Sequence, residues 1–291
     1  MFFVQLFLKG NTITDFLVSL DIRTQTIYLP HKFLDKRLMY MKHDIIILNF
    51  SNVYTEETFY KNEKIKWINC NDISGANCFC DNEASAEICR RIKYLPPQGI
   101  HFIDSGNYHY VSKFFTDKIN EDFILVVFDH HPDMQPSLFD ELLTCGSWVK
   151  ASIDTNKHLK KVILIGTSDE LLNKIDKRYT DKLIEFKESQ LEDRTAWQQF
   201  YNMHFDLPIY ISIDKDVLSP DGDVTNWDQG KATMPELKRL LSILLKHGKI
   251  IGIDICGECK YSILGLQDSS ISKDNEINRQ LAEINLQDYK S

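Results

Sequence analysis

The chain has 291 residues, of which 43% are hydrophobic and 26% charged, a balance that is typical of a folded globular protein and excludes a disordered or fibrous chain. Its formal net charge of −8 disfavours nucleic acid and anionic membranes as partners. No apolar run approaches the ~20 residues of a membrane span, and residues 2–8 lack the basic leader and cleavage region of a signal peptide, so we expect neither feature. The seven irregularly spaced cysteines favour reduced thiols. We therefore expect a cytoplasmic protein.

The first 98 residues show the weakest patterning. Residues 25–29 and 44–50 are predicted as strands, and residues 82–94 as a helix that Asn82 caps and Pro96 ends. Because no repeat or long linker marks a boundary, we expect one domain over residues 1–291. Its expected parts are a divergent N-terminal part at 1–98, a motif-bearing core at 99–260 and a C-terminal tail at 261–291 that packs as a final helix or frays.

From residue 99 onward, apolar segments of strand length alternate with segments of helical spacing. The near-continuous apolarity of these strands indicates burial on both faces, so the pattern predicts an α/β fold with a mostly parallel sheet covered by helices on each side. The expected strands are residues 100–104, 124–129, 161–165, 209–214 and 250–255. The expected helices are residues 110–119, 145–154, 196–203 and 235–247.

The strongest chemical signal is Asp129-His130-His131-Pro132-Asp133, which stands where the strand before it runs out into a loop. In extended backbone, side chains two positions apart share a face, so Asp129, His131 and Asp133 converge while His130 points away. Carboxylate and imidazole groups together are typical ligands of a divalent cation. This motif therefore predicts a metal site, with His130 beside it or at the surface.

Two further strand ends carry residues of the ligand type. The strand 209–213 ends in Asp214-Lys215-Asp216, and the strand 100–104 leads through a turn to His109. Taken singly, each of these residues could instead have a role in a turn or a helix cap. However, ligands of an open α/β sheet bind beyond the carboxyl ends of its strands, where all three motifs fall. The set of four Asp and two His therefore predicts a centre whose negative charge two divalent cations offset.

Two cysteine pairs, Cys78-x-Cys80 and Cys256-x-x-Cys259, have spacings that also occur in zinc sites and redox pairs. Neither pair is followed by a second matched pair with zinc-ribbon spacing. We therefore interpret these cysteines as reduced thiols without a bound metal.

The three Asp and His motifs resemble those of the ureohydrolase superfamily, which comprises arginase, agmatinase, formimidoylglutamase and relatives and hydrolyses guanidino or formimino groups with two manganese ions. The family patterns Gly-Gly-Asp-His, Asp-x-His-x-Asp and Ser-x-Asp-x-Asp-x-x-Asp-Pro correspond in order to residues 106–109, 129–133 and 212–220, and all six ligand positions match. The resemblance implies an arginase-like three-layer α/β/α fold with an N-terminal elaboration. It also implies two bound Mn²⁺ ions or other divalent cations.

The same resemblance assigns the six ligands to two ions. His109, Asp129, Asp133 and Asp214 would bind one ion, and His131, Asp129, Asp214 and Asp216 the other. Asp129 and Asp214 would bridge the ions and act as catalytic residues. A hydroxide between the ions would then attack the planar guanidino carbon.

The chain departs from the family next to these ligands. Tyr108 stands where the family has an Asp before the metal-binding histidine, and Cys145 stands where arginase-like members have a histidine that transfers a proton. We expect a catalytic or substrate-contacting role for Cys145, with a buried packing cysteine as the alternative.

Substrate contacts are expected from three other places. Glu258 lies in a segment similar to the family's Asp-x-x-Glu but one residue longer, and is expected to pair with a cationic group. Trp227 and Asp228 lie in a loop that does not match the family, where the indole would stack on a planar cation or pack at the rim. His130, beside the ligands, is a further candidate for substrate binding.

The leading hypothesis is a binuclear manganese-dependent hydrolase that cleaves a C–N bond of a guanidino or amidino compound and releases urea or a related product. Its substrate would be a small molecule or an arginine-containing peptide, whose arginine becomes ornithine. Two alternatives remain open: a deacetylase-type amidohydrolase with one metal on the same fold, against which six ligands argue, and a retired metal-binding protein. Relatives form trimers and hexamers, so a homo-oligomer is an open option for this chain.

Overall fold

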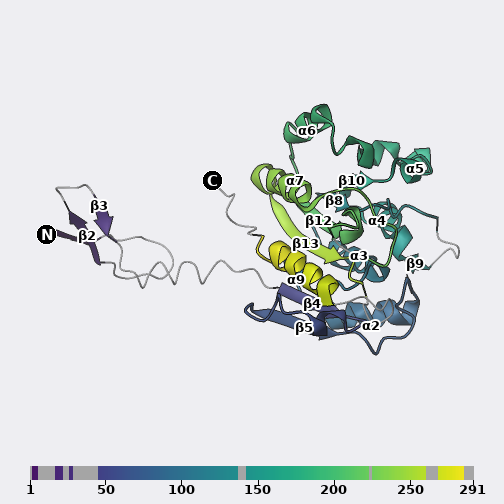
Figure 1. The fold of residues 1–291 in the computed structure, drawn as a ribbon, viewed down its shortest axis with the longest axis horizontal. Helices are drawn as coiled ribbons and strands as arrows, with labels where there is room; N and C mark the ends of the chain where they lie inside the picture. Colours follow the sequence, from purple (N-terminus) through teal and green to yellow (C-terminus); the bar gives the residue numbers. More distant parts are fainter. Residues whose placement is uncertain are drawn as a thin grey trace. The chain divides into compact units, whose positions relative to one another are not determined.

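The computed structural model describes the backbone of residues 2–5, 17–21 and 26–28, and it describes residues 45–136, 142–222, 225–259 and 268–284. Contacts divide the chain into two compact units, residues 1–42 and 43–291. In the first unit, β1 (Phe2–Gln5), β2 (Leu17–Asp21) and β3 (Thr26–Tyr28) form an antiparallel sheet in the order β1-β2-β3 (Figure 1). β3 is the strand expected at 25–29. The division differs from the single domain expected over the whole chain, because the described strands of the first unit pair with one another.

Eight strands form the central sheet of the second unit, and every neighbouring pair of them is parallel. Their order across the sheet is β11-β10-β8-β12-β13-β7-β4-β5. Their bounds are β4 (Ile45–Asn49), β5 (Ile65–Asn69), β7 (Gly99–Phe102), β8 (Phe123–Phe128), β10 (Leu159–Thr167), β11 (Leu183–Lys187), β12 (Ile209–Asp214) and β13 (Ile250–Cys256). The structure confirms all five strands expected after residue 99. It adds the two edge strands, β5 and β11, which the sequence pattern does not predict.

β4 and β5 extend the sheet of the motif-bearing core. β4 pairs with β7, so that Ile45 lies opposite Ile100 and Ile47 opposite Phe102. The side chains of Ile45, Ile46 and Ile47 are at most 2% exposed, as in a strand with neighbours on both sides and helices on both faces. The stretch from residue 45 to 98 is therefore part of the core, and no structural boundary falls at residue 98.

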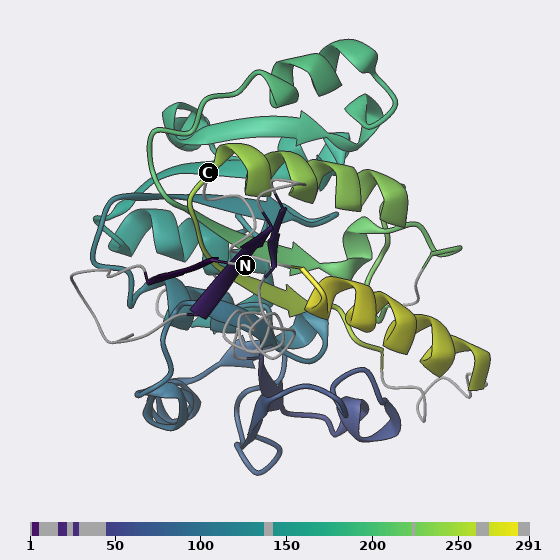
Figure 2. The same cartoon turned by 90° about the vertical axis from the view of Figure 1, so that its left-hand side faces the viewer.

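Helices cover both faces of the sheet, because the strands are apolar on both faces and each face needs a covering layer. Buried side chains of α2 (Asn82–Ile92), α3 (Val111–Thr116) and α4 (Trp148–Thr155) pack on one face. Those of α6 (Arg194–Tyr201), α7 (Met234–His247) and α9 (Asp268–Ala282) pack on the other, and Figure 2 shows α7 and α9, green and yellow, in front of the strands. Alternate residues of one strand serve the two cores, Ile45 in one and Ile46 in the other. The unit is a three-layer α/β/α structure.

Short elements connect these layers. β6 (Phe79–Cys80) and β9 (Leu143–Thr144) form a two-stranded antiparallel pair, and α5 (Asp169–Leu172) is about one helical turn. The 3₁₀ helices are η1 (Val53–Glu56), η2 (Gly106–Tyr108), η3 (Cys145–Ser147), η4 (Lys177–Lys182), η5 (Glu188–Gln190) and η6 (Lys215–Val217). Within the described ranges, none of the helices combines the length and the apolar character that crossing a bilayer requires.

The helix starts follow local capping rules, with one correction. Asp81, not Asn82, caps α2: the Asp81 carboxylate accepts a hydrogen bond from the Ala84 backbone N–H at 2.8 Å, and Asn82 is the first helical residue. A capping residue needs extended backbone and a side-chain oxygen that reaches an N–H inside the first turn, and the extended Asp81 meets both conditions. α7 begins with a capping box, in which Thr233 and Glu236 each hydrogen-bond the backbone N–H of the other. This arrangement is typical of the start of a helix.

Candidate metal centre

The four central strands bring the predicted ligands to one place. β7, β13, β12 and β8 are neighbours in the sheet and run parallel, so their carboxyl ends share one edge. All six predicted ligands come from this edge. They are His109 after η2, Asp129, His131 and Asp133 after β8, and Asp214 and Asp216 at the end of β12 and in η6. The five ligands other than His131 are at most 5% exposed.

His109 is the centre of the first cluster. Its Nδ1 atom lies 3.2 Å from Asp129 Oδ2, 3.1 Å from Asp133 Oδ2 and 3.5 Å from an oxygen of Asp214. On the other side of the ring, Nε2 lies 2.8 Å from the hydroxyl oxygen of Ser212. If Nε2–H donates to that hydroxyl, the lone pair of Nδ1 faces three carboxylates. Nδ1 is buried and makes no hydrogen bond, so the surroundings of this atom fit a cation.

His131 is the centre of the second cluster, and Asp129 belongs to both. The Nδ1 atom of His131 lies 2.9 Å from Asp216 Oδ2 and 3.5 Å from Asp129 Oδ1. Asp129 therefore directs Oδ1 at one histidine and Oδ2 at the other. This is the geometry of a carboxylate that bridges two cations. Asp214, the second bridge that the resemblance implies, lies with His109 in the first cluster, and its Oδ1 accepts a hydrogen bond from the Asp216 backbone at 3.1 Å.

Burial shifts the pKa values of the predicted ligands in both clusters. Loss of solvation and the nearby Asp216 carboxylate raise the pKa of Asp214 to about 6, and loss of solvation with Asp129 raises the pKa of Asp216 to about 7. Burial also raises the pKa of Asp129 and of Asp133. For His131, burial opposes the charged form, but the contacts with Asp129 and Asp216 prevail and raise its pKa to about 11. In the absence of a cation, protons supply the positive charge that the carboxylates need.

Neighbouring residues hold the ligands in place. The indole Nε1–H of the buried Trp148, at the start of α4, donates to Asp133 Oδ2 at 2.6 Å. The His130 backbone N–H donates to Asp216 Oδ1 at 3.0 Å. Gly257, which follows β13 with φ +103°, passes so close to Asp214 that a Cβ there would lie 2.6 Å from Oδ1. A residue other than glycine at this position would displace the ligand.

A cavity of about 520 Å³ opens above the two clusters. All six predicted ligands line it, and so do Cys145 and Trp227, which were predicted as catalytic and substrate-binding residues. Cys78, Phe79, Gln135, Pro136 and Leu142 complete much of the wall. The Trp227 ring lies edge-on to His131 with 6.0 Å between the ring centres, and its Nε1–H donates to Asn107 at 2.9 Å. The structure thus places these two predicted residues in the wall of the cavity that the six predicted ligands line.

The prediction that Glu258 contacts the substrate is not supported by its position. Glu258 is fully buried outside the cavity lining, with Oε2 2.9 Å from the ammonium of Lys215 and Oε1 accepting a hydrogen bond from Asn278 at 2.9 Å. The cause is the turn after β13, where the backbone N–H groups of Gly257 and Glu258 both donate to the Asp104 carbonyl. This turn directs Glu258 into the protein, where it faces a buried cation of the chain itself.

His130 and Asp228 also lie outside the cavity lining. His130 points away from the ligands, as the alternation of an extended chain predicts, and its Nδ1 lies 3.1 Å from a Glu188 oxygen. Asp228 is exposed and lines a neighbouring cavity of about 700 Å³, which shares Trp227 with the first. Neither position favours the predicted contact with a substrate bound at the clusters.

Sequence reasoning missed two residues that belong to the centre. Ser212 holds His109, and Cys256 lies beside Asp214 with its sulfur 3.2 Å from Oδ2. Both could be found by examining the carboxyl ends of the predicted strands, which is how the candidate ligands were identified. Ser212 is on β12 two residues before Asp214, and Cys256 is the last residue of β13. Assigning Cys256 also required knowing that β13 lies next to β12 in the sheet.

Comparison with known proteins agrees with this architecture. The family model described as Arginase family matches residues 47–257. An uncharacterised protein of Thermotoga maritima is 33% identical over 216 residues, which cover 74% of this chain and 79% of the relative.

Solved structures with the same fold are more distant in sequence. The arginase from Medicago truncatula has a TM-score of 0.63 at 11% identity, and the match covers 84% of this chain and 87% of the arginase. A hypothetical agmatinase from Burkholderia thailandensis has a TM-score of 0.58 at 12% identity, and the match covers 83% of this chain and 85% of the agmatinase. The fold, the strand-end ligands and the family match lead to one conclusion: the chain belongs to the arginase family of the ureohydrolase superfamily.

Proposed function

We propose that this arginase-family protein is a hydrolase that cleaves a C–N bond of a guanidino or amidino compound with two divalent cations, with manganese as the first choice. The observation that carries the proposal is the position of Asp129, whose two carboxylate oxygens face two different histidine-containing clusters. A binuclear centre needs a ligand of this kind, since it holds two cations close together. Family membership supports a hydrolase of this chemical type.

The described residues fit two such cations. Nδ1 of His109 with Asp129, Asp133 and Asp214 would hold one, and His131 with Asp129 and Asp216 the other, with Asp214 as the second bridge. The buried Nδ1 of His109, which makes no hydrogen bond, and the surrounding carboxylate oxygens have the nitrogen and oxygen character that Mn²⁺ accepts. When bound, the two ions would lower the pKa of a water molecule toward neutrality and so supply a nucleophile.

The cavity residues would orient the substrate. The Trp227 indole, 40% exposed at the rim, offers a flat face to a planar guanidinium. Burial, with Asp133 nearby, raises the pKa of Cys145, so this residue stays a neutral thiol near pH 7. We therefore assign Cys145 a contact with the substrate and not the role of nucleophile or general base.

The two clusters and the two cavities also bear on two alternative functions, a deacetylase-type site and a site for arginine in a peptide. A deacetylase-type site would use one cation and leave the carboxylates of the other cluster without a compensating charge. The second cavity meets the first at Trp227 and offers space for a longer substrate, so arginine in a peptide stays in our proposal beside small guanidino compounds. We further propose the cytoplasm as the compartment, from the odd number of cysteines.

The test combines metal content with product release. The purified full chain is loaded with Mn²⁺, its metal content per chain is measured, and urea release is screened over arginine, agmatine, guanidinobutyrate and arginine-containing peptides. Two ions per chain and urea from one substrate would establish the function, and a chelator-treated sample should lose both. Two ions without product from any compound would favour a retired enzyme, while one ion per chain would contradict the binuclear centre.

Metal binding is expected to weaken as the pH falls below neutrality. The pKa values of Asp214 and Asp216 are about 6 and about 7 in the metal-free protein, and both side chains must be ionised to bind a cation. Protons therefore compete with the cation once the pH falls below these values, and each competing proton costs up to about tenfold in affinity per pH unit. Competition with a chelator at several pH values between 5 and 8 measures the effect. A pH-independent affinity over this range would contradict the proposed ligand set.

A further inference from the structure

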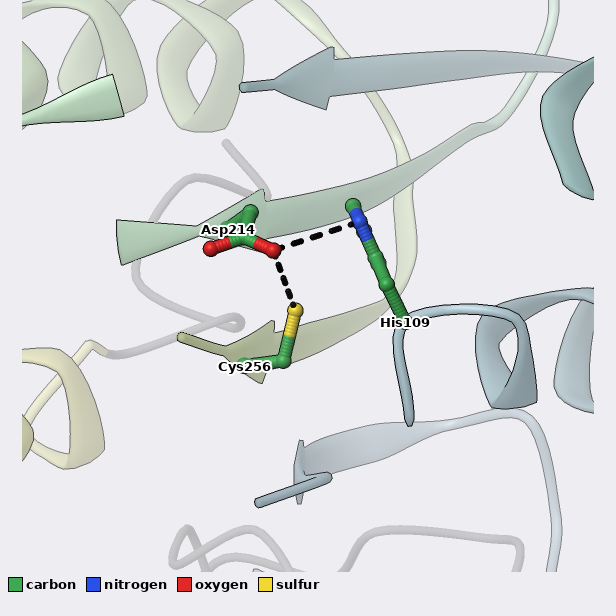
Figure 3. Close-up of side chains that lie close together, drawn as sticks. All are labelled: His109, Asp214 and Cys256. Atoms are coloured by element: carbon green, nitrogen blue, oxygen red, sulfur yellow. Dashed lines mark hydrogen bonds and ion pairs between the residues drawn. The ribbon is translucent and has the colours of Figure 1, made fainter. Parts of the chain in front are cut away.

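Cys256 lies inside the metal centre although no motif assigned it there. It is the last residue of β13 and is 1% exposed. Its Sγ atom lies 3.2 Å from Asp214 Oδ2, the same oxygen that lies 3.5 Å from Nδ1 of His109. Figure 3 shows the thiol and the imidazole both directed at this carboxylate. Ligand atoms of His109, Asp214 and Cys256 all lie within 4.8 Å of one another.

The strand register places Cys256 in this position. In the parallel pair of β12 and β13, Asp214 and Cys256 are register partners, so their side chains lie beside each other at the same sheet edge. Gly257 follows immediately, and the absence of a side chain there leaves room for the Asp214 carboxylate. The sulfur is thus held next to the ligands by the sheet itself.

A second, independent observation shows that this position is built for a cation. Nδ1 of His109 is buried, makes no hydrogen bond and is aimed into the same space. A buried cysteine by itself is most often a packing residue. Here the sulfur shares its surroundings with a buried ring nitrogen that faces carboxylate oxygens, one of them from Asp214. These three groups are positioned to hold a metal ion.

We infer that Cys256 is a metal ligand, whose thiolate binds the cation held by His109 and Asp214. The inference rests on the proposed two-cation centre. On binding, the metal–sulfur bond forms, the S–H bond breaks and the proton leaves to solvent. Cys259 lines the neighbouring cavity and is not one of the three grouped residues.

A thiolate ligand changes which metal the position prefers. Thiolate sulfur selects softer ions such as Zn²⁺, Fe²⁺ or Co²⁺, while carboxylate-rich sets suit Mn²⁺. The second cluster, formed by Asp129, His131 and Asp216, has nitrogen and oxygen ligands. The two positions therefore differ in character. We expect the His109 position to favour a softer ion than the His131 position.

The test uses Co²⁺ as a probe, because thiolate ligation to Co²⁺ produces a charge-transfer absorption band in the near ultraviolet. The metal-free full chain is titrated with Co²⁺, and wild type is compared with Cys256→Ser and with Cys145→Ser, which alters a thiol that lines the cavity outside the His109, Asp214 and Cys256 group. The band is expected in wild type and in Cys145→Ser and is expected to be lost in Cys256→Ser. Affinity for Zn²⁺ in Cys256→Ser should fall by about 100-fold or more, above the loss that follows removal of a supporting residue.

The outcomes separate this inference from the proposed function. Binding of two Co²⁺ per chain without the band would overturn Cys256 ligation and leave the two-cation centre intact. Failure of wild type to bind Co²⁺, Zn²⁺ or Mn²⁺ would overturn both. Should Cys256→Ser fail to fold, X-ray absorption of the Zn²⁺-loaded wild type decides instead. One sulfur neighbour at roughly 2.3 Å supports the ligation, and a shell of nitrogen and oxygen alone contradicts it.

Discussion

Asp129→Asn is expected to remove turnover and to weaken both cation positions together. The amide keeps the shape of the side chain, but its NH₂ group cannot bind a cation, and Asp129 directs one oxygen to each cluster. The loss of several kcal/mol of charge stabilisation corresponds to a fall in kcat/KM of about 10³-fold or more. Metal content by mass spectrometry and the rate of urea release measure the two effects on the same sample.

Asp122→Asn is the matched control for this variant. Asp122 directly precedes β8, so it lies at the opposite end of the strand that leads to Asp129, and it forms an exposed contact with Lys160 at 3.2 Å. An exposed ion pair of this kind contributes at most about 1 kcal/mol to stability, so metal content and activity should stay near those of wild type. Asp129→Asn with two bound cations and full activity would refute the bridging role.

Lys215→Met is expected to destabilise the fold strongly. Lys215, between the ligands Asp214 and Asp216, is fully buried, with its ammonium 2.9 Å from Glu258 and 2.7 Å from Asp274. Methionine has a similar length but no charge, so the variant leaves two buried carboxylates without this cation. Breaking a buried pair in this way costs about 3–5 kcal/mol. Urea unfolding measures the cost as a lower midpoint at an unchanged slope.

Two further variants make this result interpretable. Lys249→Met removes an exposed lysine that lies 3.3 Å from Glu121, and it should change stability by no more than about 1 kcal/mol. Adding Glu258→Gln and Asp274→Asn to Lys215→Met removes the two buried charges and should recover much of the lost stability. An unfolding midpoint of Lys215→Met equal to that of wild type would show that this ion cluster does not stabilise the protein. Since α9 carries Asp274, the cluster also ties this helix to the turn that bears the metal ligands.

Local sequence was sufficient to identify six candidate ligand residues that the structure brings to one edge of the sheet, and to identify the strands that carry them. Asp129, His131 and Asp133 follow an apolar run, and their spacing predicts that they lie together and that His130 points away, which is the arrangement in the structure. The backbone is not extended throughout, however, because Asp133 has a φ of +49°. The five strands expected after residue 99 could be predicted equally well, because burial on both faces makes them continuously apolar. The edge strands β5 and β11 carry partly exposed and charged residues, and so lack this signal.

Other features were decided by the tertiary structure. Glu258 resembles a family residue in sequence, but a turn beside Asp104 buries it against Lys215. Cys256 becomes a neighbour of Asp214 because β13 lies next to β12, about 40 residues away along the chain. The sequence by itself determined which residues end each strand and which way they face, since these depend on neighbours along the chain. The order of strands in the sheet decided which of those residues meet, and that order depends on packing between segments far apart in sequence.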